Sequence, residues 1–387
     1  MNAEQSPKRL VLMIVGLILA IGLLVWQLQG TSGISLPYYD FVEYWSAGRL
    51  CSEGQNPYSH ELIEKLERDL GREEPAVLMW NPPWTLTLVM PFGLLPPRVA
   101  HLLWLAISLA ILLLSAELLW RLYSTNHSHR WLTVLGLAFV PSLIALTAGQ
   151  ISPWLLLGAT LFLFAVSREQ WMLAGMASVL LAIKPHLSYL FWLALLLWCI
   201  QERQWKLIFG GLLLGGLCSL IPIWNDPDVF TSYLDALRNR PPAEYDSPTL
   251  GTLLRLWFDR DNFSLQYLSM IPGLLWLIPY WLRHRRSWDW KARMPMLLLV
   301  SMLTAAYGAW PFDAVLLLVA VLAVACRLPD SSFKIQMSAG VMYLLINVAL
   351  ALLIATDQRY FSFIWLTPAM LLCYLLLTHA TEQPAHA

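Results

Sequence analysis

Charged side chains are scarce in this sequence. Lys, Arg, Asp and Glu make up 13% of its 387 residues, about half the share usual in soluble domains. The 25 basic residues balance the 25 acidic ones, and 58% of the chain is hydrophobic. A basic nucleic-acid binder and a disordered chain are therefore excluded. The composition predicts an all-α polytopic membrane protein, with one integral membrane domain over residues 1–387.

Cysteine is also scarce, and the motifs of several enzyme classes are missing. Only five Cys are present, and four of them fall in apolar segments, so no disulfide framework is expected. The sequence has no GxxxxGK[ST] phosphate loop, no GxGxxG fingerprint, and no HExxH or Cys/His cluster with metal-ligand spacing. We expect no metal, no cofactor and no nucleic-acid partner.

About twelve apolar runs, with a range of 11 to 13, predict transmembrane helices. The first, from Leu10 to about Leu28, is read as a span with a cytoplasmic N-terminus, because it is too long for a signal peptide and no cleavage site follows it. A proline-interrupted run at 83–95 is read as a re-entrant or interfacial segment. The other predicted spans cover roughly 97–119, 131–148, 152–167, 171–183, 187–200, 207–223, 267–282, 294–310, 314–326, 335–354 and 361–378.

The distribution of basic residues orients these spans, because cytoplasmic loops of membrane proteins are rich in Lys and Arg. The short cytoplasmic loops would hold twelve Lys and Arg, five of them in RHRRSWDWKAR at 283–293, whereas the short outer loops hold only Lys184 and Arg359. Two long hydrophilic loops, about 30–82 and 224–266, then face outward. Because loops of this length are usually functional, any chemistry is expected on the outer face.

The first outer loop predicts two interfacial helices. One begins at Phe41, where apolar residues recur at helical spacing. The second covers about 60–70 and has Gly71 as its stop signal. Asp40 precedes the first helix and has two possible roles: it can cap the helix with Glu43 as its capping-box partner, or it can act as a general base on a hydroxyl.

Several other polar residues lie at the outer ends of apolar runs, where unpartnered polar groups are costly. Lys184 has two possible roles. Its ammonium group can bind a phosphate, or it can extend to the lipid headgroups. For Gln150 an inter-helix hydrogen bond is favoured, and Asp313 can pair with Lys184 or an outer arginine. His186 is read as a packed polar residue, and Asn81 opens the 83–95 segment.

Five segments in order resemble glycosyltransferase family 87 over about residues 38–320. They are DFVEYWSAGRL, NPPWTLTLVMPFGLLP, GQISPWLLLGATLFLF, AGMASVLLAIKPHLSYLF and YGAWPFDAVLLL. The resemblance implies a GT-C-type bundle, with a catalytic carboxylate in the first outer loop and a polyprenyl-phosphate sugar as donor. It assigns Asp40 as the catalytic base. Asn81 and His186 depart from the residues common in the family, which affects the sugar or acceptor that fits.

The resemblance also implies a function. We expect inverting transfer of a hexose such as mannose to a lipid-linked or glycan acceptor, at the outer face of a bacterial inner (plasma) membrane. An outer arginine, one of Arg238, Arg240, Arg255 and Arg359, is expected to hold the phosphate with Lys184. Two alternatives stay open: a polymerase or ligase of lipid-linked glycans, and a non-enzymatic glycolipid flippase or transporter. The predicted substrate-binding residues are Glu43, Tyr44, Asn81, Gln150, Lys184, His186 and Asp313.

Overall fold

The protein is helical throughout its described part. A computed structural model describes residues 40–73, 75–124, 134–243 and 245–382. Within these ranges every regular element is a helix, which confirms the all-α prediction. The predicted first span at 10–28 lies outside them.

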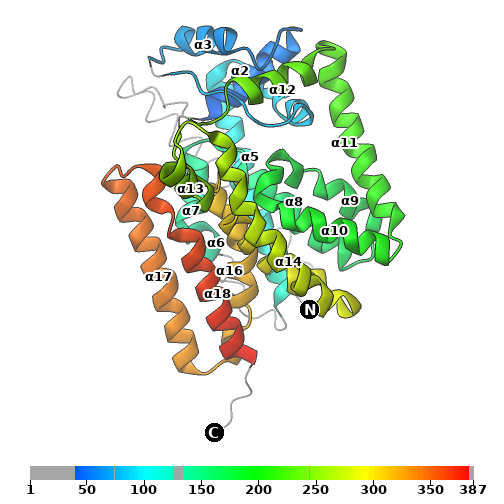
Figure 1. Ribbon diagram of the computed structural model, residues 1–387, viewed down its shortest axis with the longest axis vertical. Coiled ribbons are helices and arrows are strands. Elements are labelled where there is room, and N and C mark those ends of the chain that lie inside the picture. The colour runs from blue at the N-terminus through cyan, green and yellow to red at the C-terminus, as the bar shows by residue number, and fades with distance from the viewer. Residues whose placement is uncertain (1–39, 74, 125–133, 244, 383–387) are drawn as a thin grey trace, which may run out of the picture.

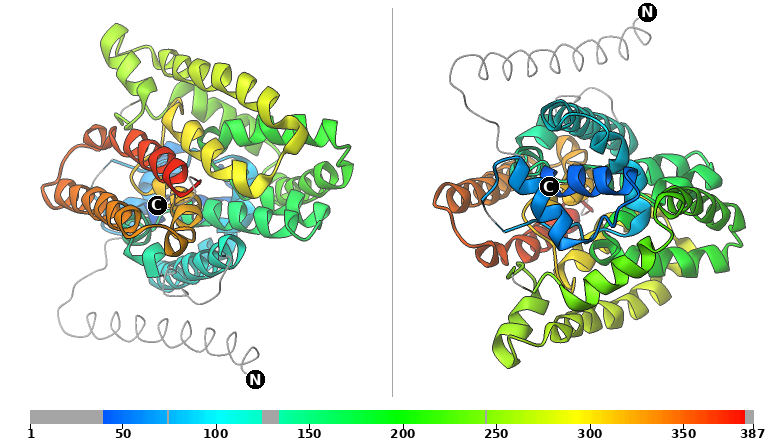
Figure 2. Two further views of the ribbon diagram at one scale, coloured as in Figure 1. Left: turned by 90° about the horizontal axis from the view of Figure 1, so that it is seen from below. Right: turned by 90° about the horizontal axis from the view of Figure 1, so that it is seen from above.

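Helices from the two long hydrophilic loops gather at one end of the molecule. In Figure 1, α2, α3 and α12 lie at the top, across the ends of the longer helices. Seen from above in Figure 2, α2 and α3 lie over the middle of the molecule. The elements of the two loops are α2 (Phe41–Ser52), α3 (His60–Asp69), α12 (Val229–Asn239), α13 (Leu250–Phe258) and η5 (Phe263–Ser269).

The apolar runs form a helical bundle beneath this end (Figure 1). Its first half contains η1 (Pro83–Thr85), α4 (Leu86–Gly93), α5 (Pro97–Tyr123), α6 (Val134–Ala138), α7 (Val140–Thr147), α8 (Ser152–Val166), α9 (Trp171–Ser178), η3 (Leu181–Ile183), η4 (Pro185–Ser188), α10 (Tyr189–Gln201) and α11 (Trp205–Asn225). Its second half contains α14 (Met270–His284), η6 (Arg285–Ser287), α15 (Trp290–Leu303), η7 (Asp313–Leu317), α16 (Leu318–Ala325), η8 (Leu328–Asp330), α17 (Phe333–Ala355), η9 (Tyr360–Phe363) and α18 (Leu366–Glu382).

Four helices of the described chain are long and apolar enough to cross a membrane. They are α5, α11, α17 and the continuous stretch Tyr360–Thr381. Other apolar helices are shorter: α8 has 15 residues and therefore a length of about 22 Å, less than the ~30 Å hydrocarbon core. The predicted total of about twelve spans stays a prediction.

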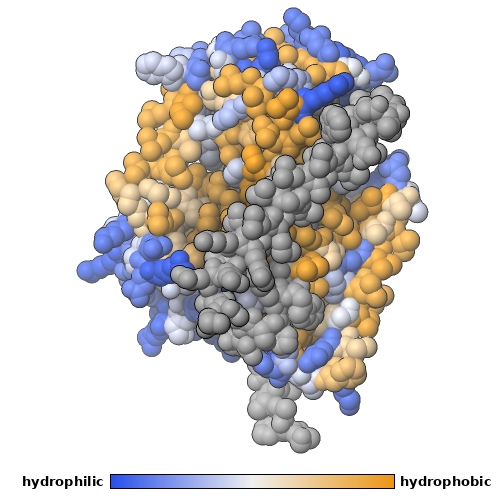
Figure 3. Space-filling view, turned by 180° about the vertical axis from the view of Figure 1, so that it is seen from behind, coloured by the Kyte–Doolittle hydropathy of each residue, from blue (hydrophilic) through white to orange (hydrophobic). Residues whose placement is uncertain are grey.

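Exposed apolar side chains on the bundle suggest a membrane-embedded protein. Large side chains such as Leu212 on α11 and Leu345 on α17 are more than half exposed. On the face drawn in Figure 3, hydrophobic residues make up most of the coloured surface at mid-height, and hydrophilic residues gather toward both ends. Exposed apolar surface of this extent is unfavourable in water, whereas lipid tails are as apolar as the side chains.

Two predicted apolar segments differ from simple spans for identifiable reasons. The run at 131–148 is divided into α6 and α7, because Pro141 opens the first turn of α7. The N–H of Val140 bonds to Asn347 Oδ1 at 2.7 Å instead of continuing a helix. The proline-interrupted run at 83–95 forms η1 and the eight-residue helix α4, about 12 Å long.

The helix predicted to begin at Phe41 is present as α2, and it packs against other helices of the protein. Ten of its 12 residues are buried. It crosses α4 at close range, since a Cβ added to Gly48 would lie 2.5 Å from the carbonyl oxygen of Val89, and one added to Gly93 would also clash with the backbone of α2. Small residues allow such approaches between membrane helices. Helix α2 is thus fixed inside the protein, and its first turn faces the site described next.

Candidate active site

A cavity of about 820 Å³ lies at the end of the molecule that carries α2, α3 and α12. Its walls come from both long hydrophilic loops and from the turns between apolar helices. Seven of the eight predicted site residues line it, so these positions, far apart in sequence, are brought together. Those seven are Asp40, Glu43, Asn81, Gln150, Lys184, His186 and Asp313. Tyr44 does not line the cavity and supports it from behind.

The Asp40 carboxylate faces this cavity and does not cap α2. The side chain of Asp40 makes no capping hydrogen bond, so the capping-box interpretation with Glu43 is wrong. The backbone of Asp40 is fixed instead, because its N–H donates to the carbonyl oxygen of Ala148 at 3.1 Å. The neighbouring Gly149 adopts φ +68° and packs against Phe41, where a Cβ would lie 2.7 Å from the Phe41 Cβ. This contact brings the turn after α7 against the start of α2.

Gln150 in that turn links Asp40 to the rest of the site. Its Nε2 donates to Asp40 Oδ2 at 2.7 Å. Its Oε1 accepts from the hydroxyl of Tyr44 at 3.0 Å and from Nζ of Lys184 at 3.1 Å. These donors fix which end of the amide faces which partner. The favoured inter-helix hydrogen bond of Gln150 is confirmed, and one of its partners is the predicted base.

Lys184 and Asp313 form a buried ion pair in the cavity wall. Lys184 Nζ lies 2.7 Å from Asp313 Oδ1, and the side chains are 12% and 0% exposed. Asp313 also accepts from Ser152 Oγ at 2.6 Å and from the N–H of Trp310 at 3.1 Å. The predicted pairing of Asp313 with Lys184 is confirmed. The Lys184 ammonium points inward, so it does not extend to the lipid headgroups.

The two carboxyl groups of the first turn of α2 differ in their tendency to ionise. Burial raises the pKa of Asp40, but the Gln150 hydrogen bond and the charges of Lys184 and Arg72 oppose this shift. Burial and the neighbouring Asp40 raise the pKa of Glu43 well above its ordinary range. Two carboxylates this close do not ionise together easily. Asp40 therefore ionises more readily than Glu43, so its carboxylate is the one available to accept a proton, and the neutral form of Glu43 is favoured.

Asn81 and His186 take packing roles in the wall. Asn81 Nδ2 donates to the carbonyl oxygen of Ile183 at 3.1 Å, which ties the first outer loop to the turn that carries Lys184. The ring of His186 stacks on Tyr307 with 4.1 Å between centroids. The prediction of His186 as a packed polar residue is confirmed.

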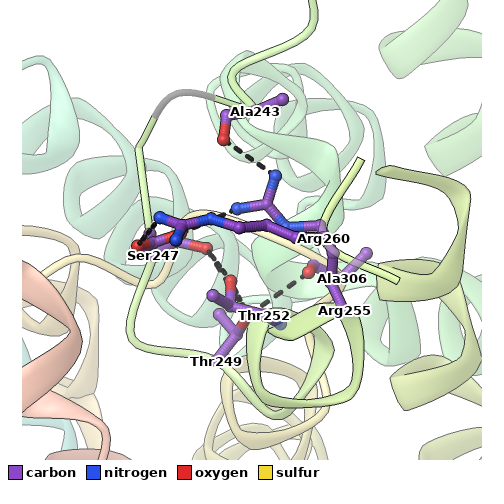
Figure 4. A network of polar contacts seen from close by, with 8 residues as sticks. Ala243, Ser247, Thr249, Thr252, Arg255, Arg260 and Ala306 are labelled. Carbon is purple, nitrogen blue, oxygen red and sulfur yellow. Dashed lines mark hydrogen bonds and ion pairs between the residues drawn. The ribbon is translucent and has the colours of Figure 1, made fainter. Parts of the chain in front are cut away.

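A network of polar contacts around Arg255 holds the second long loop together (Figure 4), and Tyr245 and Ser247 of this loop line the cavity. Arg255, on α13, donates to the carbonyl oxygen of Ala243 at 2.8 Å and to Asp246 Oδ1 at 2.9 Å. In the same network Thr249 Oγ1 bonds to the carbonyl oxygen of Ala306 at 3.3 Å. Arg255 is only 2% exposed, so its guanidinium is used within the protein.

The arginine that holds phosphate stays a prediction, and the structure brings a different arginine to the cavity. None of the four predicted residues, all of them described, lines the cavity, whereas Arg72 of the first outer loop does. Aromatic side chains were missed as well, although one of them, Trp310, directly precedes a proline. Trp80, Tyr245, Trp310 and Tyr360 form a row of successive ring contacts along the wall, with centroid distances of 4.9 to 6.3 Å. These rings offer flat apolar surface beside the polar groups.

Comparison with known proteins adds one finding. A sequence model of glycosyltransferase family 87 matches residues 80–356. This range covers more than half of the chain and includes Asn81, Gln150, Lys184 and Asp313, whereas Asp40 lies before it. No curated protein and no solved structure matches the chain.

Proposed function

The chain belongs to glycosyltransferase family 87, and from this premise we propose that it transfers a sugar from a polyprenyl-phosphate carrier to a hydroxyl group, with Asp40 as the base. The sugar would be a hexose such as mannose, and the acceptor a lipid-linked or glycan hydroxyl at the outer face of a bacterial inner membrane. One observation carries the proposal: the Asp40 carboxylate, held by Gln150 at 2.7 Å, lies in the wall of a cavity large enough for a sugar and its acceptor.

The chemistry is a single displacement at the anomeric carbon C1. The acceptor oxygen forms a bond to C1 on one face, the bond from C1 to the phosphate oxygen breaks with its electron pair on the other, and the configuration inverts. The acceptor proton passes to Asp40. The leaving phosphate monoester is a stable anion and needs no protein acid. As in glycosidases, the transition state has oxocarbenium character.

The surrounding groups support this role for Asp40. Its raised pKa makes its carboxylate a stronger base than an exposed aspartate. Gln150 contacts both Asp40 and Lys184 and so fixes the carboxylate relative to the ion pair. Such preorganised polar groups stabilise developing charge without reorganisation. The proposed reaction uses protein side chains alone, with no metal.

Purified protein tested with synthetic polyprenyl-phosphate sugars checks the proposal. We expect Asp40→Asn to reduce transfer by about 10²- to 10⁴-fold without loss of folding, because the asparagine amide oxygen can still accept from Gln150 Nε2. Asp69→Asn is the matched control, since Asp69 is an exposed outer-loop aspartate that does not line the cavity. Full activity of Asp40→Asn would contradict the assignment.

The same assay separates the two alternatives. A polymerase or ligase would join lipid-linked oligosaccharides and would not use a single sugar on a polyprenyl phosphate. A flippase would move glycolipid across vesicles without forming a glycosidic bond. The family assignment favours the transferase over the flippase.

A further inference from the structure

Two Lys or Arg residues of the described chain line the cavity, and each is paired with an acid. Among the described residues, Arg72 and Lys184 are the Lys and Arg side chains that line the cavity. The charge of Lys184 is compensated by Asp313 at 2.7 Å, which lines the same cavity. Arg72 is paired with Glu67, a residue that lies outside the cavity lining. The guanidinium of Arg72 is therefore a second cation at the cavity, in addition to the Lys184 ammonium.

The end of α3 determines the position of Arg72. Gly71, with φ +82°, follows the last turn of the helix. The N–H of Gly71 donates to the carbonyl oxygen of Arg68 at 2.9 Å, and the N–H of Arg72 donates to that of Glu67 at 3.1 Å. These two hydrogen bonds form a Schellman motif. The backbone of Arg72 is thus held at a defined point beyond the helix, although its surroundings are a charged loop.

Glu67 takes the place of a residue that is usually apolar. In a Schellman motif the side chain at this helix position commonly makes a hydrophobic contact with the second residue past the cap. Here the pair is ionic: Arg72 Nε lies 3.5 Å from Glu67 Oε2, and the side chains are 20% and 2% exposed. Glu67 Oε1 also accepts from the N–H of Val77 at 3.1 Å. Burial raises the pKa of Glu67 to about 7.

A buried carboxylate at this place is unfavourable for stability in two ways. It loses hydration, and it lies in the last turns of α3, where the helix dipole disfavours negative charge. A hydrophobic pair would satisfy the motif without either effect. The ion pair instead holds a guanidinium beside the cavity, close enough to Asp40 that its charge lowers the pKa of that carboxyl group.

We propose that Arg72 binds the phosphate group of the polyprenyl-phosphate donor and that Glu67 is a positioning residue that holds the Arg72 guanidinium in place. The inference rests on the proposed function, and it replaces the four outer arginines expected from the sequence. Arginine suits this task because its planar fork can donate two parallel hydrogen bonds to a phosphate. Lys184, fixed by Asp313, then organises Gln150 and Asp40.

A binding experiment without turnover tests Arg72. Purified full-length protein is titrated with farnesyl phosphate, a short polyprenyl phosphate, and with farnesol as the uncharged counterpart. We expect Arg72→Gln to raise the Kd for farnesyl phosphate by about 10- to 100-fold and to leave farnesol binding unchanged. Arg72→Lys should recover part of the loss, because it keeps the charge and lacks the fork. Arg49→Gln is the control, since Arg49 pairs with Glu53 at 2.9 Å outside the cavity lining.

Two results would overturn the inference, and they differ in what else they imply. If Arg72→Gln binds farnesyl phosphate as the wild type does while Asp40→Asn abolishes transfer, the assignment of Arg72 is wrong and the proposed function stands. If the wild type binds farnesol and farnesyl phosphate equally, neither Arg72 nor any other group recognises the phosphate, and the proposed donor fails with it.

Glu67→Gln tests the positioning role. The glutamine carbonyl can still accept from the N–H of Val77, so the loop keeps its backbone contact. We expect the KM for the donor to rise several-fold with kcat nearly unchanged. A lower melting temperature with an unchanged donor KM would show that Glu67 is structural only and would contradict its positioning role.

Discussion

The cavity wall and the α17 helix use buried polar groups in opposite ways. In the wall, the side chains of Asp40, Gln150, Lys184 and Asp313 bond to one another around an open cavity. In α17 the buried Asn347 accepts from the N–H of Val140, where the chain breaks between α6 and α7, and so satisfies a backbone group. A buried polar residue in a membrane helix is thus no marker of a site by itself. Its convergence with others on a cavity is the marker.

The largest expected effect comes from removing one partner of the buried ion pair. Lys184→Ala leaves the Asp313 carboxylate, which is fully buried, without its cation. We expect a loss of about 3–5 kcal/mol in the free energy of unfolding, measured by denaturation in detergent. The double variant Lys184→Met with Asp313→Leu should lose less stability than the sum of the losses measured for Lys184→Met alone and Asp313→Leu alone. Additive losses would show that the two charges are not coupled.

A pair of glycine substitutions contrasts the two regions directly. Gly48→Ala places a Cβ 2.5 Å from the carbonyl oxygen of Val89, so α2 and α4 must separate, and we expect a loss of about 1–3 kcal/mol. In α17, a Cβ at Gly340 meets nothing within 4 Å. Gly340→Ala should stabilise the helix by about 0.5–1 kcal/mol. Melting temperatures that move in the same direction would contradict the contrast.

The third prediction concerns pH and the hydrogen bond to the base. The Gln150 amide lowers the pKa of Asp40, against the raising effect of burial. Gln150→Ala removes that hydrogen bond, so the pKa of Asp40 should rise further. A carboxylate accepts a proton only when it is ionised, so under the proposed function activity is lost as pH falls through the pKa of Asp40. The acidic limb of the kcat/KM profile should therefore move to higher pH, and an unmoved limb would show that this bond does not tune the base.

The smallest effect is expected on the exposed face of α17. Leu345 is 62% exposed, and in a bilayer it contacts lipid tails that are as apolar as itself. We expect Leu345→Ala to change the free energy of unfolding by no more than about 0.5 kcal/mol, as other surface substitutions do. The melting temperature in lipid nanodiscs is the measurement. A large loss would mean that this face of α17 packs against protein.

The sequence predicted the helical class and the polar positions of the site for a simple reason. Polar groups at the ends of apolar runs are rare, so Gln150, Lys184 and Asp313 stand out without any structure. The capping box of Asp40 was wrong because the same spacing serves a capping residue and a cavity residue. Contacts with Ala148 and Gln150, more than 100 positions away, decide between them.

Arg72 was missed for the opposite reason. It lies in a loop with nine acidic and four basic residues, where a single arginine gives no signal. Its place depends on Gly71 and on the buried Glu67, and the burial of Glu67 is a tertiary property. The lengths of individual helices could not be predicted from the sequence either. Apolar runs such as 131–148 are interrupted where a distant side chain, here Asn347, accepts a hydrogen bond from a backbone N–H.

The hydrogen bond between Gln150 and Asp40 joins residues 110 positions apart, and this separation has a consequence for the order of assembly. A chain that has inserted only its first helices contains Asp40 but not the amide and ammonium groups that orient it. Long-range contacts of this kind form late in folding. Under the proposed function, catalytic competence is therefore acquired only after Gln150 and Lys184 have reached Asp40, and the turnover of a sample reports how much of the protein has formed these contacts.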